Sequence, residues 1–442
     1  MDDEIIELLP NEKGYGSKMI AGLHEGVMIT SIYKISHNSS VTHTEVANNF
    51  KQKATEILNS NKWLMARLKN LKTPTKRLAL VISQKHANPD DYILIETNDD
   101  VPDMENIKSE SEVSFKTAKS VLAKYDVGWS KNLWDKENGK MCKFGQVWNP
   151  EKTTCYMFLV INHCLSDGAS VYKVWKMLAP EVEVTSLNPI RKQDFDVGLK
   201  SETSLLPEGC TMESLYGKLN GSVIPAMLVK GFCQGVKGTV FKDCFLKFDK
   251  KFIEQEKSKY CNGTEFVSTN DVLTCWFGNL IQKRNAPKFD NLMLAFDCRS
   301  RVPGVEQNMT GNYITAPIMR KSDLETPKTV RNWINFVTEK GNSWTYPSYS
   351  EFRKFIGGIN TSWVKFYHHV EPEGLEQVLH FPVFADLDIR LGLGIPLGNE
   401  LNIIIFRSGK DDISCYVYSR RDDVTVEWLL EEDIVEGLLM KS

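Results

Sequence analysis

The sequence of 442 residues lacks the features that would place it in a membrane, outside the cell or on nucleic acid. No run approaches the roughly 20 apolar residues that a membrane-spanning helix needs. The N-terminal stretch MDDEIIELLPNEKGYGS is acidic and polar, unlike a secretory signal or a transit peptide. The 54 Lys and Arg do not outnumber the 57 Asp and Glu, so charge gives no reason to expect binding to nucleic acid or to an anionic membrane. We therefore expect a cytoplasmic protein with no membrane span and no nucleic-acid partner.

The sequence also lacks the motifs of a zinc site and of a hydrolytic serine. Its ten cysteines include no CxxC pair, so no metal is expected. Several of them (Cys155, Cys275 and Cys415) lie inside apolar runs, which fits small buried side chains in a reducing compartment. No GxSxG serine is present either, and a nucleophile-activating triad is not indicated.

What is present describes a globular protein of two domains. Hydrophobic residues make up 42% of the chain and charged residues 25%, and the chain is too long for one ordinary core. The stretch 191–225 is rich in Lys, Asp, Ser, Glu and Gly and has weak periodicity, which is typical of a connection between domains. We predict an N-terminal domain over 1–190, a linker over 191–225 and a C-terminal domain over 226–442. Apolar patterns predict strands near 26–36, 77–84, 140–149, 152–162, 239–248, 291–297, 313–319, 401–407 and 413–419. They predict helices in 42–60, 114–127, 169–179, 250–259, 269–284 and from about residue 425. The fold class is therefore α/β, in the sense of α+β layers.

The most informative stretch is 156–168, with the sequence YMFLVINHCLSDG. Its first six residues form a continuous apolar run and, with Asn162, predict a strand of seven residues buried on both faces. His163 then lies where the strand ends, and a loop on a rigid sheet is where catalytic side chains concentrate. Apolar residues at i, i+4 and i+7 follow the Asp-Gly pair and predict a helix. The alternative is a core histidine that caps the strand.

His163 and Asp167 suggest a general base and its support. A neutral imidazole could remove a proton from an alcohol or amine that attacks an activated acyl carbon. Asp167 need not touch a substrate: a buried carboxylate paired with an arginine could hold the loop. Gly168 would permit a tight turn that a Cβ hinders. Alone, the HxxxDG pattern is too simple to be specific.

A second group of polar residues lies in AFDCRSRVPGVEQNMTGNYI, residues 295–314. A predicted strand leads into Asp297, Arg299 and Arg301. We nominate Arg299 as the partner of Asp167, because a guanidinium forms a planar, two-pronged pair with a carboxylate. The alternatives are solvated loop arginines and, for the Gly-Asn pair at Asn312, a simple turn.

The third segment is FVSTNDVLTCWFGNLIQKR, residues 266–284. Ser268 or Thr269 is a candidate helix N-cap, with Asp271 in the first turn. This pattern predicts a core helix, although a helix N-terminus can also bind an anionic ligand.

In this order and spacing, these segments resemble the BAHD acyltransferases. NHCLSDG resembles their HxxxDG motif, which chloramphenicol acetyltransferase and the condensation domains of peptide synthetases share; VSTNDVLTCWF and FDCRSRVP followed by TGNYI resemble two further BAHD passages, and NSNKWLMARL resembles an N-terminal one. The resemblance spans about residues 15–430. It implies two chloramphenicol-acetyltransferase-like domains, each a mixed sheet with flanking helices, joined by a crossover, with a tunnel between them.

The resemblance implies an acyl-CoA-dependent O- or N-acyltransferase. His163 would be the general base, and Asp167 with Arg299 the structural pair that orients it. Acyl-CoA would be the co-substrate, with no permanently bound cofactor, and the acceptor a small-molecule alcohol or amine; a monomer is expected. Asn312, Thr310 and Ser268 are candidate donors to the oxyanion. Cys164, a tempting nucleophile, is disfavoured because adjacent side chains at a strand end point apart.

Two departures from the family pattern keep alternatives open. The DFGWG motif of BAHD enzymes matches only Asp388 and Gly392 in the stretch DIRLG; the stretch 194–198 is closer in letters but lies in the linker. Asn162 stands where condensation domains usually have a second histidine. The alternatives are a condensation-type enzyme that takes its acyl group from a carrier protein, and a catalytically degenerate binding protein of the same fold.

Lysines gather between residues 230 and 251 with few acids among them. Such a cluster could line the entrance for the phosphates of CoA, or could be an ordinary solvated face, which we favour. The six lysines are Lys230, Lys237, Lys242, Lys247, Lys250 and Lys251.

Overall fold

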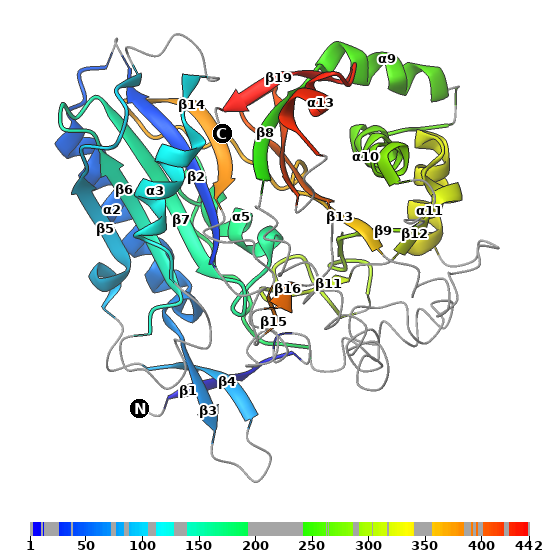
Figure 1. The fold of residues 1–442 in the computed structure, drawn as a ribbon. Helices are drawn as coiled ribbons and strands as arrows, with labels where there is room; N and C mark the ends of the chain where they lie inside the picture. Colours follow the sequence, from blue (N-terminus) through cyan, green and yellow to red (C-terminus); the bar gives the residue numbers. More distant parts are fainter. Residues whose placement is uncertain are drawn as a thin grey trace.

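A computed structural model shows how these segments are arranged (Figure 1). It describes residues 3–9, 12, 26–36, 39–71, 77–83, 88–104, 112–127, 139–192, 242–261, 263, 265–285, 291–302, 304–315, 318–339, 356–383, 390–391, 395–396, 401–419 and 424–440. The predicted linker 191–225 lies almost wholly outside these residues, as do Asp388, Gly392, Lys230 and Lys237.

The first large sheet contains the predicted histidine strand near its centre. Strand β7 (Thr154–Asn162) is buried along its whole length, as the apolar run predicts, and pairs antiparallel with β2 on one side and β6 on the other. The order across the sheet is β14-β2-β7-β6-β5. The other strands are β2 (Gly26–Ile35), β5 (Ile93–Thr97), β6 (Cys142–Trp148) and β14 (Leu375–Val383).

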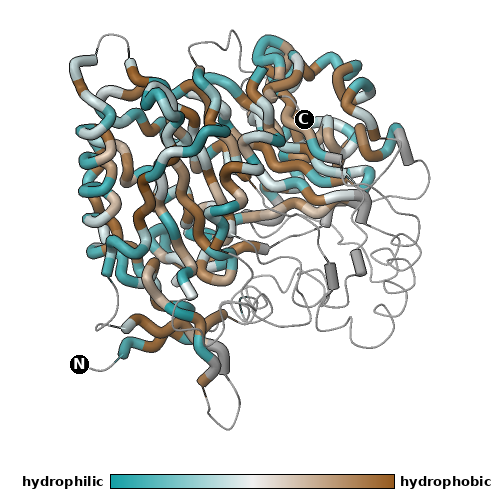
Figure 2. Tube along the Cα trace, turned by 60° about the vertical axis from the view of Figure 1, so that its left-hand side comes forward, coloured by the Kyte–Doolittle hydropathy of each residue, from teal (hydrophilic) through white to brown (hydrophobic). Residues whose placement is uncertain are grey.

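Among the described residues, helices α2, α3 and α5 pack on this sheet. Helix α2 (His43–Ser60) begins at Thr42, whose side chain and that of Glu45 form a reciprocal capping box. Helix α3 (Phe115–Ala123) contributes apolar side chains to the same core, and α5 (Gly168–Lys176) directly follows the His163 loop. Hydrophobic residues concentrate along the strands of both large sheets (Figure 2).

The second large sheet is built by the C-terminal half, in the order β12-β9-β13-β17-β18-β8-β19. Helices α9, α10 and α11 pack on it through a separate apolar core (Figure 1). The strands are β8 (Lys242–Phe248), β9 (Asn291–Leu294), β12 (Ile318–Arg320), β13 (Ile356–Ser362), β17 (Leu401–Arg407), β18 (Ile413–Ser419) and β19 (Val435–Met440), and the helices α9 (Lys250–Tyr260), α10 (Thr269–Asn285), α11 (Pro327–Glu339) and α13 (Val426–Leu430).

Strand β14 comes from the C-terminal half but belongs to the first sheet, where it pairs with β2. His380 on β14 is fully buried, and its two ring nitrogens lie 2.8 Å from the Ser31 hydroxyl and 2.9 Å from the Tyr172 hydroxyl. Burial lowers the pKa of His380 to about 3, so this histidine is neutral. An aromatic cluster also joins the sheets, because Phe115 of α3 lies 4.6 Å, between ring centroids, from Phe245 of β8. The two halves of the chain are therefore interlocked.

Shorter sheets complete the described structure. A three-stranded sheet in the order β1-β4-β3 carries the N-terminal segment. Two-stranded pairs are formed by β10 with β11 and by β15 with β16. Their bounds are β1 (Glu4–Glu7), β3 (Arg67–Leu71), β4 (Arg77–Ile82), β10 (Phe296–Asp297), β11 (Ile314–Thr315), β15 (Arg390–Leu391) and β16 (Ile395–Pro396).

The predicted α/β class and most of the predicted elements are confirmed. The C-terminal prediction was wrong: instead of one closing helix, the short α13 is followed by β19, which pairs with the edge of β8. The apolar residues of that stretch are compatible with both the helical and the strand periodicity. The stretch forms a strand because it pairs with the otherwise unpaired edge of β8. The sequence also failed to predict helix α11 and strands β13 and β14. The division into domains at 190 and 226 stays a prediction.

Candidate active site

His163 lies at the first position after β7, as the apolar run predicts. The buried side chain of Asn162 shapes the turn: its oxygen accepts a hydrogen bond from the amide of Cys164 at 3.0 Å. The Asn162 carbonyl accepts another from the amide of Leu165 at 2.8 Å. This local turn presents the histidine at the end of the central strand of a rigid sheet.

The surroundings of His163 favour its neutral form. Burial lowers the pKa of the imidazole, and the nearby Asp167 carboxylate and Asn312 only partly oppose this shift. The side-chain amide of Asn312 donates a hydrogen bond to the His163 carbonyl at 2.7 Å. The backbone of His163 is therefore fixed by the segment that contains the Gly311-Asn312 pair, called the GN segment below. A neutral imidazole is the form that can accept a proton.

Asp167 forms a two-pronged ion pair with Arg299, the partner nominated from the sequence. The guanidinium donates to the two carboxylate oxygens at 2.8 and 3.1 Å, and both side chains are almost completely buried. Asp167 is also the N-cap of α5, where it accepts a hydrogen bond from the Ser170 amide at 2.9 Å. Burial alone would raise the pKa of Asp167, but Arg299 and these hydrogen bonds outweigh it and hold the pKa below its ordinary value. Asp167 is therefore an ionised structural group.

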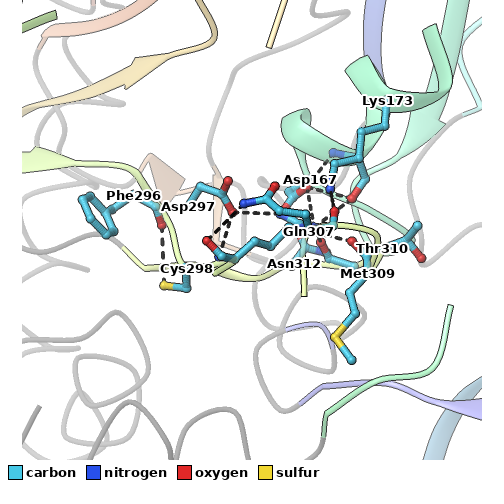
Figure 3. A network of polar contacts seen from close by, with 12 residues as sticks. Asp167, Lys173, Phe296, Asp297, Cys298, Gln307, Met309, Thr310 and Asn312 are labelled. Atoms are coloured by element: carbon cyan, nitrogen blue, oxygen red, sulfur yellow. Dashed lines mark hydrogen bonds and ion pairs between the residues drawn. The ribbon is translucent and has the colours of Figure 1, made fainter. Parts of the chain in front are cut away.

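Arg299 makes a larger set of polar contacts. Figure 3 shows three of its partners, Asp167, Asp297 and Met309, within one network. Arg299 donates to the Asp297 carboxylate at 3.0 Å and to the carbonyls of Met309 and Gly311 at 2.9 and 2.8 Å. Asp297 in turn lies 3.6 Å from the ammonium of Lys365. A single buried arginine thus ties the His163 loop to the segment that carries the GN pair.

Gly168 has a different role from the predicted one. It is the first residue of α5 and has an ordinary helical backbone, so no tight turn requires a glycine there. A Cβ at this position would lie 2.9 Å from the indole of Trp363, which follows β13. The glycine permits close packing of the loop against the second half of the chain.

The side chains of the three candidate oxyanion donors form hydrogen bonds with other residues of the protein. Ser268, at the start of α10, bonds with Asp271 and Arg331. The Thr310 hydroxyl accepts from Arg191 at 3.2 Å, and the side-chain amide of Asn312 donates to His163 and, at 3.4 Å, to Glu12. A role of these residues at an oxyanion stays a prediction.

Cys164 is unsuited to be a nucleophile. It is completely buried, burial raises the pKa of its thiol, and its sulfur donates to the carbonyl of Glu12 at 3.7 Å. A reactive cysteine requires an accessible thiolate. Within the described ranges, no group of three or more His, Cys, Asp or Glu side chains is placed to hold a metal ion. In the same part of the chain, no helix is both long and apolar enough to cross a membrane.

Glu12 and Arg191 were missed by the sequence analysis. They form a second buried ion pair beside the His163 loop, with 3.0 Å between Nε and Oε2. No motif marked them, because Glu12 is one acid in an acidic N-terminus and Arg191 begins the predicted linker. Of the lysine cluster, Lys247 and Lys250 pair with Asp412 and Asp411 at 3.4 and 4.0 Å, which favours a solvated face.

Comparison with known proteins identifies the fold. No protein-family model and no curated protein matches the sequence. TRI101 of F. graminearum, solved with coenzyme A and deoxynivalenol, matches over 98% of both chains at 11% identity, with a TM-score of 0.53. Vinorine synthase covers 99% of this chain and 98% of its own at 10% identity and a TM-score of 0.55. The starter condensation domain of rhizomide synthetase covers 96% and 90% at 9% identity and a TM-score of 0.54.

The chain has the chloramphenicol acetyltransferase-like fold. This fold extends over nearly the whole length of each of the three solved structures, so the predicted two-domain architecture is confirmed at the level of the fold. Identities of 9–11% carry no information on substrates.

Proposed function

We propose that this protein is an acyltransferase that moves an acyl group from a CoA thioester to a hydroxyl or amine, with His163 as the general base. The observation that carries the proposal is the His163 loop itself: a neutral imidazole at the end of a buried strand, with Asp167 locked in a two-pronged pair with Arg299. The chain also shares its fold with TRI101, which was solved with coenzyme A.

The reaction needs only one residue to handle the proton. His163 takes the proton of the acceptor while the acceptor oxygen or nitrogen bonds to the thioester carbonyl carbon. The tetrahedral intermediate then collapses, its carbon–sulfur bond breaks, and the imidazolium returns the proton to the CoA sulfur. The products are an ester or amide and free CoA thiol. No covalent acyl-enzyme forms, which agrees with the buried thiol of Cys164.

Asp167 would act on this reaction through position alone. Arg299 and Ser170 engage both of its carboxylate oxygens, so it is not available to relay a proton from the imidazole. We assign Asp167, Arg299 and Asp297 to holding the loop. Acyl-CoA would be a co-substrate and the acceptor a small molecule, in a monomeric cytoplasmic protein.

A carrier-protein thioester is the second candidate donor, because the chain shares its fold with condensation domains and its sequence resembles enzymes of that type. The donor can be tested with purified protein, a panel of acyl-CoAs and mixed hydroxyl and amine acceptors, with free thiol release as the readout. We expect turnover that His163→Ala lowers by about 10²–10⁴-fold, the usual contribution of a general base. If no acyl-CoA gives turnover above that of His163→Ala, the CoA-dependent function is wrong, and carrier-bound donors are tested next.

A further inference from the structure

The ion pair between Glu12 and Arg191 is completely buried. Neither side chain has any exposed surface, and the carboxylate oxygen lies 3.0 Å from the guanidinium Nε. Removing two charges from water costs several kcal/mol per ion unless hydrogen bonds satisfy the remaining donors and acceptors. The hydrogen bonds around the pair therefore indicate which segments of the chain it fixes in place.

Arg191 forms hydrogen bonds with both the His163 loop and the GN segment. Its NH2 group donates to the carbonyl of Leu165, two residues after His163, at 2.7 Å. Its NH1 group donates to the carbonyls of Thr310 and Pro189, both at 2.8 Å. A guanidinium can reach these separate acceptors at once because its donors form a rigid planar fork.

Glu12 reaches His163 through one intermediate residue. Its Oε1 accepts a hydrogen bond from the backbone amide of Asn312 at 2.8 Å, and the side-chain amide of Asn312 donates to the carbonyl of His163 at 2.7 Å. Its Oε2 accepts from the amide of Leu9 at 2.9 Å and fixes the N-terminal segment. The pair thus joins four segments that are far apart in the sequence.

Gly311 is shaped to the pair. Its φ of +117° is a conformation that side chains rarely adopt, and a Cβ there would lie 2.7 Å from Nε of Arg191 and 2.8 Å from Oε1 of Glu12. The glycine of the GN pair is therefore required by the ion pair, which packs directly against the backbone beside Asn312. This close packing is an observation independent of the hydrogen bonds, and it places the same ion pair against the residue before Asn312.

We propose that Glu12 and Arg191 are positioning residues that hold the His163 side of the loop, while Asp167 and Arg299 hold its other end. This inference rests on the proposed function, in which the backbone of His163 must be fixed for its imidazole to meet the acceptor. This pair, called the Glu12–Arg191 clamp below, acts through the carbonyls of His163 and Leu165. Neither Glu12 nor Arg191 touches the substrate. A misplacement of about 1 Å at a catalytic group costs about 100-fold in rate.

The test separates positioning from stability. The double variant Glu12→Leu/Arg191→Met removes the charges together, because replacing both partners by apolar residues is often neutral for stability, whereas removing one is strongly destabilising. We expect it to stay folded, with kcat lowered about 10–100-fold and KM for the acyl-CoA changed less than about threefold. Arg191→Lys is not expected to rescue kcat, since an ammonium lacks the fork that reaches Leu165 and Thr310.

Tyr33→Phe is the matched control for stability. It removes a buried hydrogen bond, at 2.5 Å, from the Tyr33 hydroxyl to the carbonyl of Val370, at the end of β2 away from His163. We expect it to lower stability and leave kcat unchanged. Wild-type kcat in a folded double variant would overturn the positioning role.

A second readout does not require turnover. Amide hydrogen exchange reports local opening of the backbone, and the double variant should exchange residues 164–166 at least tenfold faster than Tyr33→Phe. If the wild type shows no turnover, the proposed function fails while exchange still tests the clamp. Unchanged exchange at 164–166 would refute the clamp whatever the activity.

Discussion

Asp167→Asn provides the sharpest test of the buried pair with Arg299. The substitution keeps the shape of the side chain and an oxygen that can cap α5, since asparagine is as good an N-cap as aspartate. It removes the charge and replaces the acceptor at 2.8 Å from the guanidinium with an amide NH2, which is a donor; the oxygen at 3.1 Å, which also caps α5, remains. The loss therefore reports the ion pair rather than the helix cap.

The expected loss in the free energy of unfolding depends on the partners that Arg299 keeps in the variant. Breaking a buried pair costs about 3–5 kcal/mol, because the remaining charge is left without compensation. Arg299 still has Asp297 at 3.0 Å, so we expect the lower end of that range, about 3 kcal/mol of the free energy of unfolding. This is a large share of the roughly 5–15 kcal/mol that stabilises an ordinary protein.

Urea unfolding measures the effect, with Glu265→Gln as the control. Glu265 pairs with Lys328 at 2.7 Å, but both side chains are about half exposed, and such surface pairs contribute about 0–1 kcal/mol. The double variant Asp167→Asn/Arg299→Met should recover part of the loss, since it leaves no buried charge facing an amide. If Asp167→Asn lies within about 1 kcal/mol of Glu265→Gln, the reasoning from burial is refuted.

The same pair predicts the sign of a pH effect. The folded-state pKa of Asp167 is below its ordinary value of 3.8, so its ionised form stabilises the fold above that pH. The stabilisation is lost as the pH falls through the lowered pKa. The difference in unfolding free energy between wild type and Asp167→Asn should therefore be full at neutral pH and shrink below about pH 4.

Three further predictions concern the loop. The acid limb of the kcat/KM profile should have its midpoint below pH 6.5, because burial lowers the pKa of His163 and only the neutral ring is a base; a midpoint above 6.5 would contradict this assignment. Gly168→Ala should cost about 1–3 kcal/mol in urea unfolding because its Cβ meets the Trp363 indole at 2.9 Å, and Gly168→Ala/Trp363→Phe should lose less than the two single variants combined. Cys164→Ala should retain activity in the thiol-release assay, since the buried thiol has a raised pKa; loss of activity in a variant of unchanged stability would reopen a covalent mechanism.

Much of the candidate site could be predicted because its signals are local. Residues 156–161 before His163 are all apolar, a pattern that fits a short strand buried on both faces, and β7 has this environment. Arg299 could be nominated because a buried aspartate needs a cation and this arginine follows a predicted strand. Gly168 was also singled out, but its reason was misjudged: the indole that excludes a Cβ comes from Trp363, far along the chain.

Other parts of the fold had no local signal. Strand β14 lies in the C-terminal half, and only its pairing with β2 and the contacts of His380 with Ser31 and Tyr172 place it in the first sheet. Strand β19 has a pattern compatible with a helix, and the unpaired edge of β8 determines its form.

The sequence by itself determined the chemistry of the loop: a histidine at a strand end, an aspartate four residues on, and an arginine to neutralise it. Only the tertiary structure decided what fixes the other side of that loop, because Glu12 and Arg191 are 179 residues apart and an ion pair leaves no periodicity in the sequence. A strand or helix repeats its pattern over neighbouring residues, whereas a buried charge is stabilised by whichever opposite charge the fold brings to it.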